Sequence, residues 1–279
     1  MTSFSVLASV YKKEEAVYLD RCLKSCWDDQ VCKPNEIIVV EDGPLSPELY
    51  EVINKWEVKL GTNIFKVLKL PVNQGLAFAL NRGIEASSNN IIFRMDTDDI
   101  CHPNRFSNQL NYLQNNPDVD ILGSWCFIID ENGNEIGAKK FPVSHSEIKR
   151  LIWTNPVVHP SIVFRKDRVE AIGSYDEKLA RRQDYELWFR AIHKGLIFAN
   201  IPEYLLYYRI TDNYYVKNNL SAAWHQSKIG YRGLRLVGGN LFAYMAVFMP
   251  TFRALFPKKV AKFIHKIAGK FDPRSRLDS

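Results

Sequence analysis

Residues 91–99 read IIFRMDTDD, an apolar run that ends in three aspartates, Asp96, Asp98 and Asp99. The two isoleucines and the phenylalanine are typical of a strand buried inside a sheet. Carboxylates this close together repel one another, so each needs water or a cation beside it. The stretch therefore predicts a buried strand whose carboxyl end reaches the surface or holds a positive ion.

Three similar strands precede this stretch, and one amphipathic segment follows each of them. The expected strands span residues 4–11, 36–43, 64–70 and 89–99. The expected helices span residues 14–29, 47–60 and 73–87. Strands that alternate with single helices need crossover connections, which indicate a parallel sheet with helices on both faces. We therefore expect an α/β fold with a Rossmann-like, mostly parallel central sheet flanked by helices.

Acidic residues follow two of these strands. Glu41 and Asp42 come after the second strand, and the aspartate cluster follows the fourth. Parallel sheets bind ligands at the carboxyl ends of their strands, so both groups are expected at one site. The D-x-D spacing of Asp96 and Asp98 suits Mg²⁺ or Mn²⁺, which takes its other ligands from water and a phosphate-bearing substrate. The sequence has neither a P-loop nor a G-x-G-x-x-G after the first strand, which argues against ATPase-type and NAD sites.

After Asp99 the strict alternation ends. Helices are expected over residues 103–117, 145–153 and 181–195, strands over 120–130 and 202–210, and a strand followed by a short helix within 160–173. The Asn132-Gly133 pair, which follows the strand at 120–130, predicts a hairpin turn.

Positive charge is concentrated at the C-terminus. Residues 217–279 contain twelve lysines and arginines and two aspartates, which leaves the rest of the chain mildly acidic within a total net charge of +6. Residues 255–270 place apolar side chains at helical spacing with lysines between them, which predicts a basic amphipathic helix. Such a helix either lies on an anionic membrane or packs on the protein with its lysines in water. The residues expected at a membrane are Lys258, Lys259, Lys262, Phe263 and Lys266.

Five segments, in this order, resemble motifs of the inverting family 2 glycosyltransferases: SVLASVYKKEEAVYLDRCLKSC (5–26), EIIVVEDG (36–43), NQGLAFALNRGIEAS (73–87), FRMDTDD (93–99) and RRQDYELWFR (181–190). The resemblance covers residues 4–210, about three quarters of the chain. It implies the GT-A fold and a nucleotide-diphosphosugar donor, and it is strongest to bacterial enzymes of O-antigen or capsule synthesis. We expect a catalytic domain over 1–212, with a nucleotide-sugar-binding half (1–100) and an acceptor-binding half (101–212), and a helical, basic, membrane-associating tail over 213–279.

The resemblance also implies which residues bind the donor and the metal. Asp42, which follows Glu41 where the family usually has DDG, would hold the uracil N3–H. Asp98 would hold the metal on the diphosphate, Asp96 would bind the ribose or ligate through water, and Asp99 would meet the donor sugar. The other residues expected to border the nucleotide or the donor are Ala8, Ser9, Val10, Tyr11, Glu14, Asn73, Gly75, Arg82 and Thr97.

An inverting transfer needs a carboxylate that removes the proton of the acceptor hydroxyl while its oxygen attacks C1 opposite the leaving diphosphate. The family places this base in a Glu-Asp pair that opens a helix, and the corresponding pair here is Gln183-Asp184. The resemblance therefore assigns the base to Asp184, although a helix dipole alone also favours an acid at this position. Arg181, Gln183 and His159 are further candidates near the diphosphate or the acceptor, and a lone histidine is also often structural.

These features predict an enzyme that transfers a hexose (glucose, galactose or an N-acetylhexosamine) from a UDP-sugar to a lipid-diphosphate-linked saccharide in bacterial polysaccharide synthesis. The reaction would invert the donor to a β linkage and use Mn²⁺ or Mg²⁺. The acceptor, on a polyprenyl diphosphate, would bring the enzyme to the cytoplasmic face of the inner membrane as a peripheral protein. Five cysteines without a C-x-x-C pair agree with a reducing compartment.

Two other classes of protein also use paired acids or a basic tail. A metal-dependent nucleic-acid-binding protein is disfavoured, and no nucleic-acid partner is expected, because the catalytic half is net acidic. A nucleotidyltransferase usually has a glycine-rich loop with Arg or Lys after the first strand, whereas residues 11–15 (YKKEE) contain no glycine. Release of pyrophosphate rather than a nucleoside diphosphate would identify the second alternative.

Overall fold

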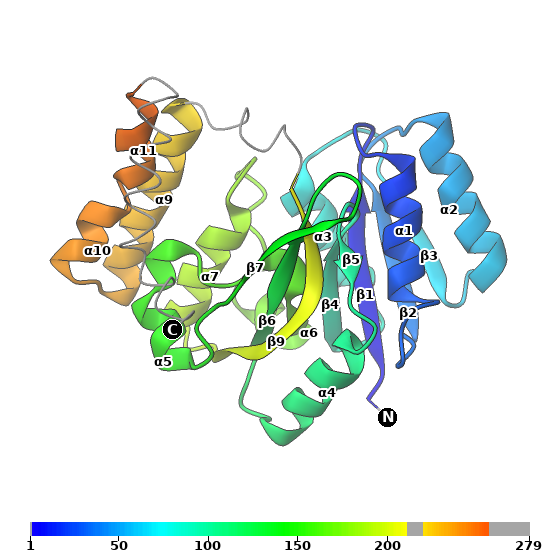
Figure 1. The fold of residues 1–279 in the computed structure, drawn as a ribbon, viewed down its shortest axis with the longest axis horizontal. Coiled ribbons are helices and arrows are strands. Elements are labelled where there is room, and N and C mark those ends of the chain that lie inside the picture. The colour runs from blue at the N-terminus through cyan, green and yellow to red at the C-terminus, as the bar shows by residue number, and fades with distance from the viewer. Residues whose placement is uncertain (1, 211–219, 257–279) are drawn as a thin grey trace.

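The computed structural model describes residues 2–210 and 220–256, which form a nine-stranded sheet with helices on both faces (Figure 1). The strands are β1 (Phe4–Val10), β2 (Glu36–Glu41), β3 (Phe65–Lys69), β4 (Ile91–Asp96), β5 (Ile100–Cys101), β6 (Ile121–Ile129), β7 (Glu135–Lys139), β8 (Val163–Arg165) and β9 (Phe198–Arg209). Their order across the sheet is β3-β2-β1-β4-β8-β6-β9-β5, and β7 pairs with β6.

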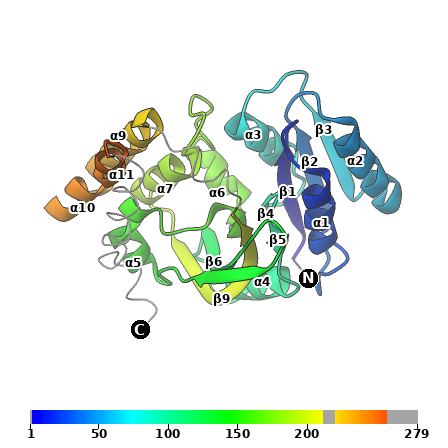
Figure 2. The same ribbon diagram turned by 45° about the horizontal axis from the view of Figure 1, so that its top comes forward.

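Helices cover both faces of this sheet (Figure 2). They are α1 (Ala16–Cys26), α2 (Pro47–Leu60), α3 (Leu76–Ala86), α4 (Arg105–Asn115), α5 (His145–Arg150), α6 (Lys166–Ala171), α7 (Gln183–His193), α9 (Leu220–Val237), α10 (Leu241–Ala246) and α11 (Met249–Ala254), with 3-10 turns at Ile152–Thr154 and His159–Ser161. One core cluster joins the sheet to α1, α2 and α4, and the other joins it to α3, α6 and α7. The α/β architecture expected from the sequence is confirmed.

The first four strands pair in parallel, in the spatial order β3-β2-β1-β4. β1 and β2 are almost entirely buried, as expected for strands covered on both faces. β1 lies between β2 and β4, so the carboxyl ends of all three strands meet at one edge of the sheet. This edge brings together the acidic segments that follow β2 and β4.

The second half of the sheet is mixed in direction. β8 runs antiparallel to β4 and β6, whereas β9 runs parallel to β6. The strands expected at 120–130 and 202–210 are present, but β9 begins earlier, at Phe198. Segments distant in sequence therefore meet beside β4, and the strands after β4 belong to the same sheet as the first four.

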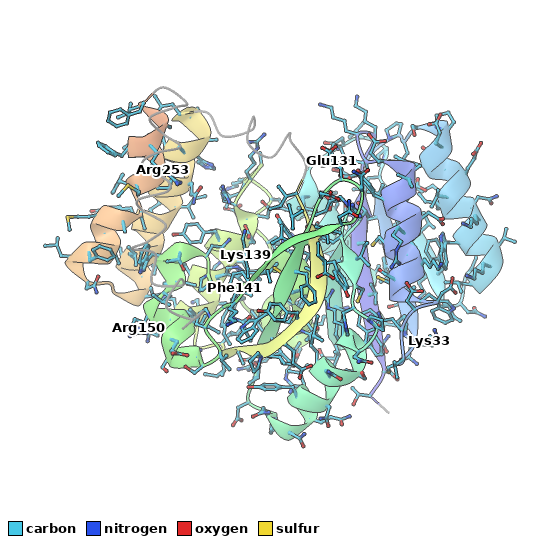
Figure 3. All side chains as sticks on the ribbon, in the orientation of Figure 1. Lys33, Glu131, Lys139, Phe141, Arg150 and Arg253 are labelled. Atoms are coloured by element: carbon cyan, nitrogen blue, oxygen red, sulfur yellow. The ribbon has the colours of Figure 1, made fainter. Side chains whose placement is uncertain are left out.

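The hairpin expected at Asn132-Gly133 joins β6 to β7, and Gly133 has a φ of +87° that favours glycine. Figure 3 labels Glu131 at the tip of this hairpin. The Glu131 carbonyl accepts hydrogen bonds from the Tyr18 hydroxyl (3.0 Å) and from Nη1 of Arg209 (3.0 Å). The hairpin tip is therefore tied to α1 and to the end of β9, next to the aspartate cluster.

Arg105 is a fully buried cation in the core beneath β4. Its Nη2 donates to the carbonyl oxygens of Arg94 (2.9 Å) and Ile162 (3.1 Å), and its Nε donates to Oε1 of Gln109 (3.0 Å). These bonds join α4 to the strand that carries the aspartates and to the start of β8. Arg105 therefore holds β4, which carries the aspartate cluster, against α4 and β8.

Arg105→Met is expected to lower the free energy of unfolding by about 3 kcal/mol, because it leaves buried carbonyl groups without their donors. Urea denaturation followed by circular dichroism measures this change. Lys59→Met is the control, because the Lys59–Asp28 pair is partly exposed and removing it costs less than about 1 kcal/mol. A loss below about 1 kcal/mol for Arg105→Met would contradict the anchoring role.

The C-terminal helices α9, α10 and α11 pack beside α7, at the end of the molecule away from α1 and α2 (Figure 1). Among residues 2–210 and 220–256, no helix is both long and apolar enough to cross a membrane. The residues expected to contact a membrane, Lys258, Lys259, Lys262, Phe263 and Lys266, lie outside the described ranges, so that prediction is not tested. All five cysteines are free thiols.

Candidate active site

The candidate site lies at the carboxyl edge of β1, β2 and β4. In the parallel register Ser9 pairs with Asp96, and Val10 pairs with Glu41. Ala8 and Val10 are buried, and Ser9 and Tyr11 are partly exposed at the same edge. The structure therefore brings the predicted residues of β1 next to the acids that follow β2 and β4.

Asp42 organises the loop that leads into α3. Its two carboxylate oxygens accept hydrogen bonds from the backbone amides of Gln74 (2.7 Å) and Gly75 (3.0 Å), and its carbonyl accepts one from Asn73 (3.1 Å). Gly43 is required beside it, because a Cβ there would lie 2.5 Å from the Asn73 nitrogen. Asp42, Asn73 and Gly75 thus form one unit, and the predicted contact of Asp42 with uracil remains a prediction.

Electrostatic interactions link the end of β1 to the segment before α7. The pKa of the Tyr11 hydroxyl is raised by burial and by the charges of Glu14 and Asp98, and Arg181 opposes this shift. These four predicted residues therefore lie close together. Arg82 is placed differently: its guanidinium pairs with Glu85 (2.9 Å) and Glu177 (3.3 Å), so it also ties α3 to the loop before α7.

Asp96, Asp98 and Asp99 each offer a carboxylate oxygen within 4.8 Å of the other two. Burial and the neighbouring charge of Asp96 raise the pKa of Asp98 to about 6. Asp99 is 1% exposed; its Oδ1 accepts from the amide of Arg209 (2.8 Å), while its buried Oδ2 has no partner among the described residues. Thr97 is buried between these acids. The cluster is therefore short of positive charge and of hydrogen-bond donors.

Two arginines lie against the aspartate cluster but do not satisfy it. Arg94 is buried and donates to Asp96, yet its Nε and Nη1 find no acceptor within the described part of the chain. The Arg209 backbone amide reaches Asp99, but its side-chain Nε donates to the Asp98 carbonyl (2.7 Å). An unpartnered carboxylate oxygen beside further carboxylate oxygens suits Mn²⁺ or Mg²⁺, which prefer oxygen ligands. Asp98, Asp96 and Asp99 are the residues that would hold the ion.

Asp184 is the second residue of α7, and its Oδ2 accepts a hydrogen bond from the side-chain amide of Asn155 (3.1 Å). Two non-glycine residues beside it have left-handed backbones: Asn155 with φ 54° and Arg182 with φ 63°. Such conformations are costly and gather at functional sites. Gln183 is buried, so only Asp184 of the predicted pair offers a partly exposed side chain.

His159 and Tyr175 form a buried hydrogen-bonded pair. Nε2 of His159 and the Tyr175 hydroxyl are 2.7 Å apart, and both residues are buried. Burial, together with the charge of Arg94, holds the pKa of His159 well below its usual value, so its ring is neutral. Burial raises the pKa of Tyr175; the charge of Arg94 opposes this shift, and the charges of Asp184 and Asp96 add to it. The charges of both Asp184 and Asp96 therefore act on Tyr175.

Asn155 and Tyr175 are the residues that the sequence analysis missed. Both lie in connecting segments, and no periodicity or spacing distinguishes either of them. The Asn155 Oδ1 is buried and unpartnered in the described structure, so it has a free acceptor beside Asp184. The sequence feature available at Asn155 was the Asn-Pro pair at 155–156, which predicts a turn but does not predict a contact with Asp184.

Asn155→Gly is expected to lower kcat by about ten- to a hundredfold, because a hydrogen bond to a charged group is worth about 1.5–3 kcal/mol. Glycine keeps the left-handed backbone, so the substitution tests the side-chain amide alone. Steady-state release of the nucleotide product measures the effect. Asn116→Gly, at the end of α4 on the other face of the sheet, is the control, and equal activity of the two variants would contradict a positioning role for Asn155.

Sequence comparison identifies the class of protein to which this site belongs. The family described as "Glycosyl transferase family 2" matches residues 5–188, about two thirds of the chain. The chain belongs to this family, and it is a sugar-transferring enzyme with the GT-A fold, as the resemblance in its motifs predicted.

Particular relatives extend over almost the whole chain. "Amylovoran biosynthesis glycosyltransferase AmsE" of Erwinia amylovora is 34% identical over 94% of this chain and 98% of its own. "UDP-Gal:alpha-D-GlcNAc-diphosphoundecaprenol beta-1,3-galactosyltransferase" of Escherichia coli is 30% identical over 93% of this chain and 96% of its own. The mannosyltransferase PcManGT of Pyrobaculum calidifontis, solved with GDP-Man and Mn²⁺, superposes with a TM-score of 0.64 at 15% identity over 98% of this chain and 82% of its own, which supports the fold alone.

Proposed function

We propose that this enzyme transfers a hexose from a UDP-sugar, with inversion, to a saccharide carried on a lipid diphosphate in bacterial polysaccharide or O-antigen synthesis. The observation that carries the proposal is the cluster of Asp96, Asp98 and Asp99, whose carboxylate oxygens lie within 4.8 Å of one another and include an Asp99 Oδ2 that is unpartnered among the described residues. A base and a diphosphate-binding acid cluster must approach one anomeric carbon from opposite sides. The substrates named for the Escherichia coli relative supply the donor and acceptor classes.

The chemistry follows from where the side chains are held. Asp184, held by Asn155, takes the proton of the acceptor hydroxyl while the hydroxyl oxygen attacks C1 of the donor sugar and UDP leaves. An α-linked UDP-hexose then gives a β-linked product. A divalent cation bound by Asp98, with Asp96 and Asp99 beside it, would neutralise charge on the leaving diphosphate. Tyr11 and the loop held by Asp42 border the nucleotide.

His159 does not compete with Asp184 for the role of base. Its ring is buried and neutral, and Nε2 is already 2.7 Å from the Tyr175 hydroxyl. This hydrogen bond fixes the orientation of the Tyr175 hydroxyl. We therefore assign His159 a positioning role on the acceptor side.

A lipid-linked acceptor requires the enzyme to work at a membrane surface. We assign it to the cytoplasmic face of the inner membrane, as a peripheral protein, where UDP-sugars are available. The basic residues of 257–279 would contribute electrostatic attraction to anionic lipids. The positively charged C-terminus and the mildly acidic catalytic half fit a membrane better than a nucleic acid.

The decisive experiment measures UDP release from a panel of UDP-sugars, with an acceptor carrying N-acetylglucosamine or N-acetylgalactosamine on a lipid diphosphate. Acceptor-dependent UDP release from one donor, lost in EDTA, is the expected result. Release of pyrophosphate from a nucleoside triphosphate would instead identify a nucleotidyltransferase. Failure to bind UDP with Mn²⁺ in a calorimetric titration would overturn the proposal.

A further inference from the structure

Exposed apolar side chains gather on the C-terminal helices. Of the seventeen large apolar side chains exposed in the described residues, eleven lie within 220–256. We call this surface the C-terminal face and define it by residues that are 41% to 76% exposed: Trp224, Tyr231, Leu241, Met245, Phe252 and Leu255. Apolar surface gathered in this way on a water-soluble domain marks an interaction site.

Aromatic contacts join α9 to the segment between α10 and α11. Trp224 and Tyr231 of α9 lie seven residues apart, on one side of the helix, and both rings contact Phe248, with centroids 6.0 and 6.1 Å away. Tyr231 also contacts Tyr244 of α10, at 5.7 Å. The aromatic rings therefore connect α9 to the segment that carries Met245 and leads into α11.

Exposed cations lie among these apolar side chains. Lys228, Arg232 and Arg235 of α9 are exposed, and the sequence from 220 to 256 contains no acidic residue. Arg253 of α11, labelled at the same end of the molecule in Figure 3, is only partly exposed. Tryptophan, tyrosine and basic residues beside aliphatic side chains are the combination found where a protein rests in the headgroup region of a lipid bilayer.

We propose that the C-terminal face lies on an anionic lipid bilayer and inserts its apolar side chains at the headgroup boundary. Charge complementarity decides between possible occupants. A second copy would bring the same cations into apposition across a twofold interface. The segment 257–279 contains seven lysines and arginines against two aspartates, so it too would repel this face. Anionic lipid headgroups complement the positive charge of the C-terminal face and that of residues 257–279.

The helix α9, which carries part of the C-terminal face, packs closely on α7 because two of its contact residues are glycines. α9 packs on α7 through Gly230 and Gly233: a Cβ at Gly233 would lie 2.2 Å from the Phe189 ring, and one at Gly230 would lie 2.8 Å from the Tyr185 hydroxyl. Tyr185 directly follows Asp184. A bilayer under the C-terminal face would therefore stand in a fixed relation to the acceptor side of the site.

The choice of a bilayer rests on the proposed function, because a lipid-linked acceptor resides in a bilayer. The C-terminal face is a membrane-binding surface separate from the lysines of 257–279. The test uses flotation of the full-length protein with vesicles of phosphatidylethanolamine and phosphatidylglycerol (3:1). Leu241→Gln, Met245→Gln and Phe252→Gln, combined in one variant, should reduce vesicle binding about tenfold or more without changing the net charge. The matched control combines Val17→Gln, Val31→Gln and Val58→Gln, three exposed valines at the other end of the molecule.

Activity separates this inference from the proposed function. The triple variant should lose transfer to a long-chain acceptor in vesicles and keep transfer to a short-chain, water-soluble acceptor within about twofold. Vesicle binding without sugar transfer to either acceptor would overturn the proposed function alone. Unchanged vesicle binding by the triple variant would overturn the inference, as would loss of binding only when Lys258, Lys259, Lys262 and Lys266 become glutamine. If sedimentation showed that the wild-type protein is a dimer and the triple variant a monomer, the C-terminal face would bind a second copy of the chain, and the inference would be wrong.

Discussion

Replacement of Asp184 by Asn is expected to lower kcat about a thousandfold while the affinity for the UDP-sugar stays within about threefold of wild type. Asparagine has the same shape but cannot accept the proton of the acceptor hydroxyl. The side-chain amide of Asn155 lies 3.1 Å from Asp184, so the replacement keeps a polar group in this position. Steady-state release of UDP measures kcat, and calorimetric titration measures donor affinity.

Glu186→Gln is the matched control for Asp184→Asn. Glu186 is another carboxylate in the first turn of α7, and it pairs with Arg190 at 2.8 Å, away from Asn155. If the role of Asp184 were only to complement the helix dipole, the two variants would lose similar amounts of stability and keep similar activity. Asp184→Asn with more than about a tenth of the wild-type kcat would show that another group takes the proton.

Local patterns predicted the elements that are built from local interactions. α2 runs over Pro47–Leu60, the predicted range, because Pro47 begins the helix, the Ser46 side chain caps it and Gly61 follows its last residue. The parallel order of the first four strands followed from their alternation with helices. The position of the aspartates followed in turn, since residues after parallel strands meet at one edge.

Pairings between distant segments could not be predicted in the same way. β8 fits between β4 and β6 because Val163 and Phe164 pair with residues about seventy and about forty positions earlier, and no local pattern encodes that choice. The same limit applies to the site. Asn155 and Tyr175 reach Asp184 and the Asp96 region only through tertiary packing, whereas Asp184 was found because its motif is contiguous.

The aspartate cluster has the second large expected effect. Asp98→Asn should abolish measurable Mn²⁺ binding and lower kcat by about a hundred- to a thousandfold, because the leaving diphosphate loses several kcal/mol of charge stabilisation. Asp98 is the residue to change, because burial and the charge of Asp96 raise its pKa to about 6 against the opposing charges of Arg94 and Arg209, as expected for a carboxylate that a bound cation would stabilise. Mn²⁺ titration monitored by electron paramagnetic resonance measures binding without relying on activity.

The control for this prediction is Asp167→Asn, which removes an exposed carboxylate after β8, beside the amino end of β4. It should leave Mn²⁺ binding and kcat within about twofold of wild type. Two variants of equal charge then separate a site effect from a change in net charge. Mn²⁺ binding retained by Asp98→Asn would contradict the assignment of Asp98 as the principal ligand. In that case Asp99, whose Oδ2 is buried and unpartnered in the described structure, would be the ligand to test next.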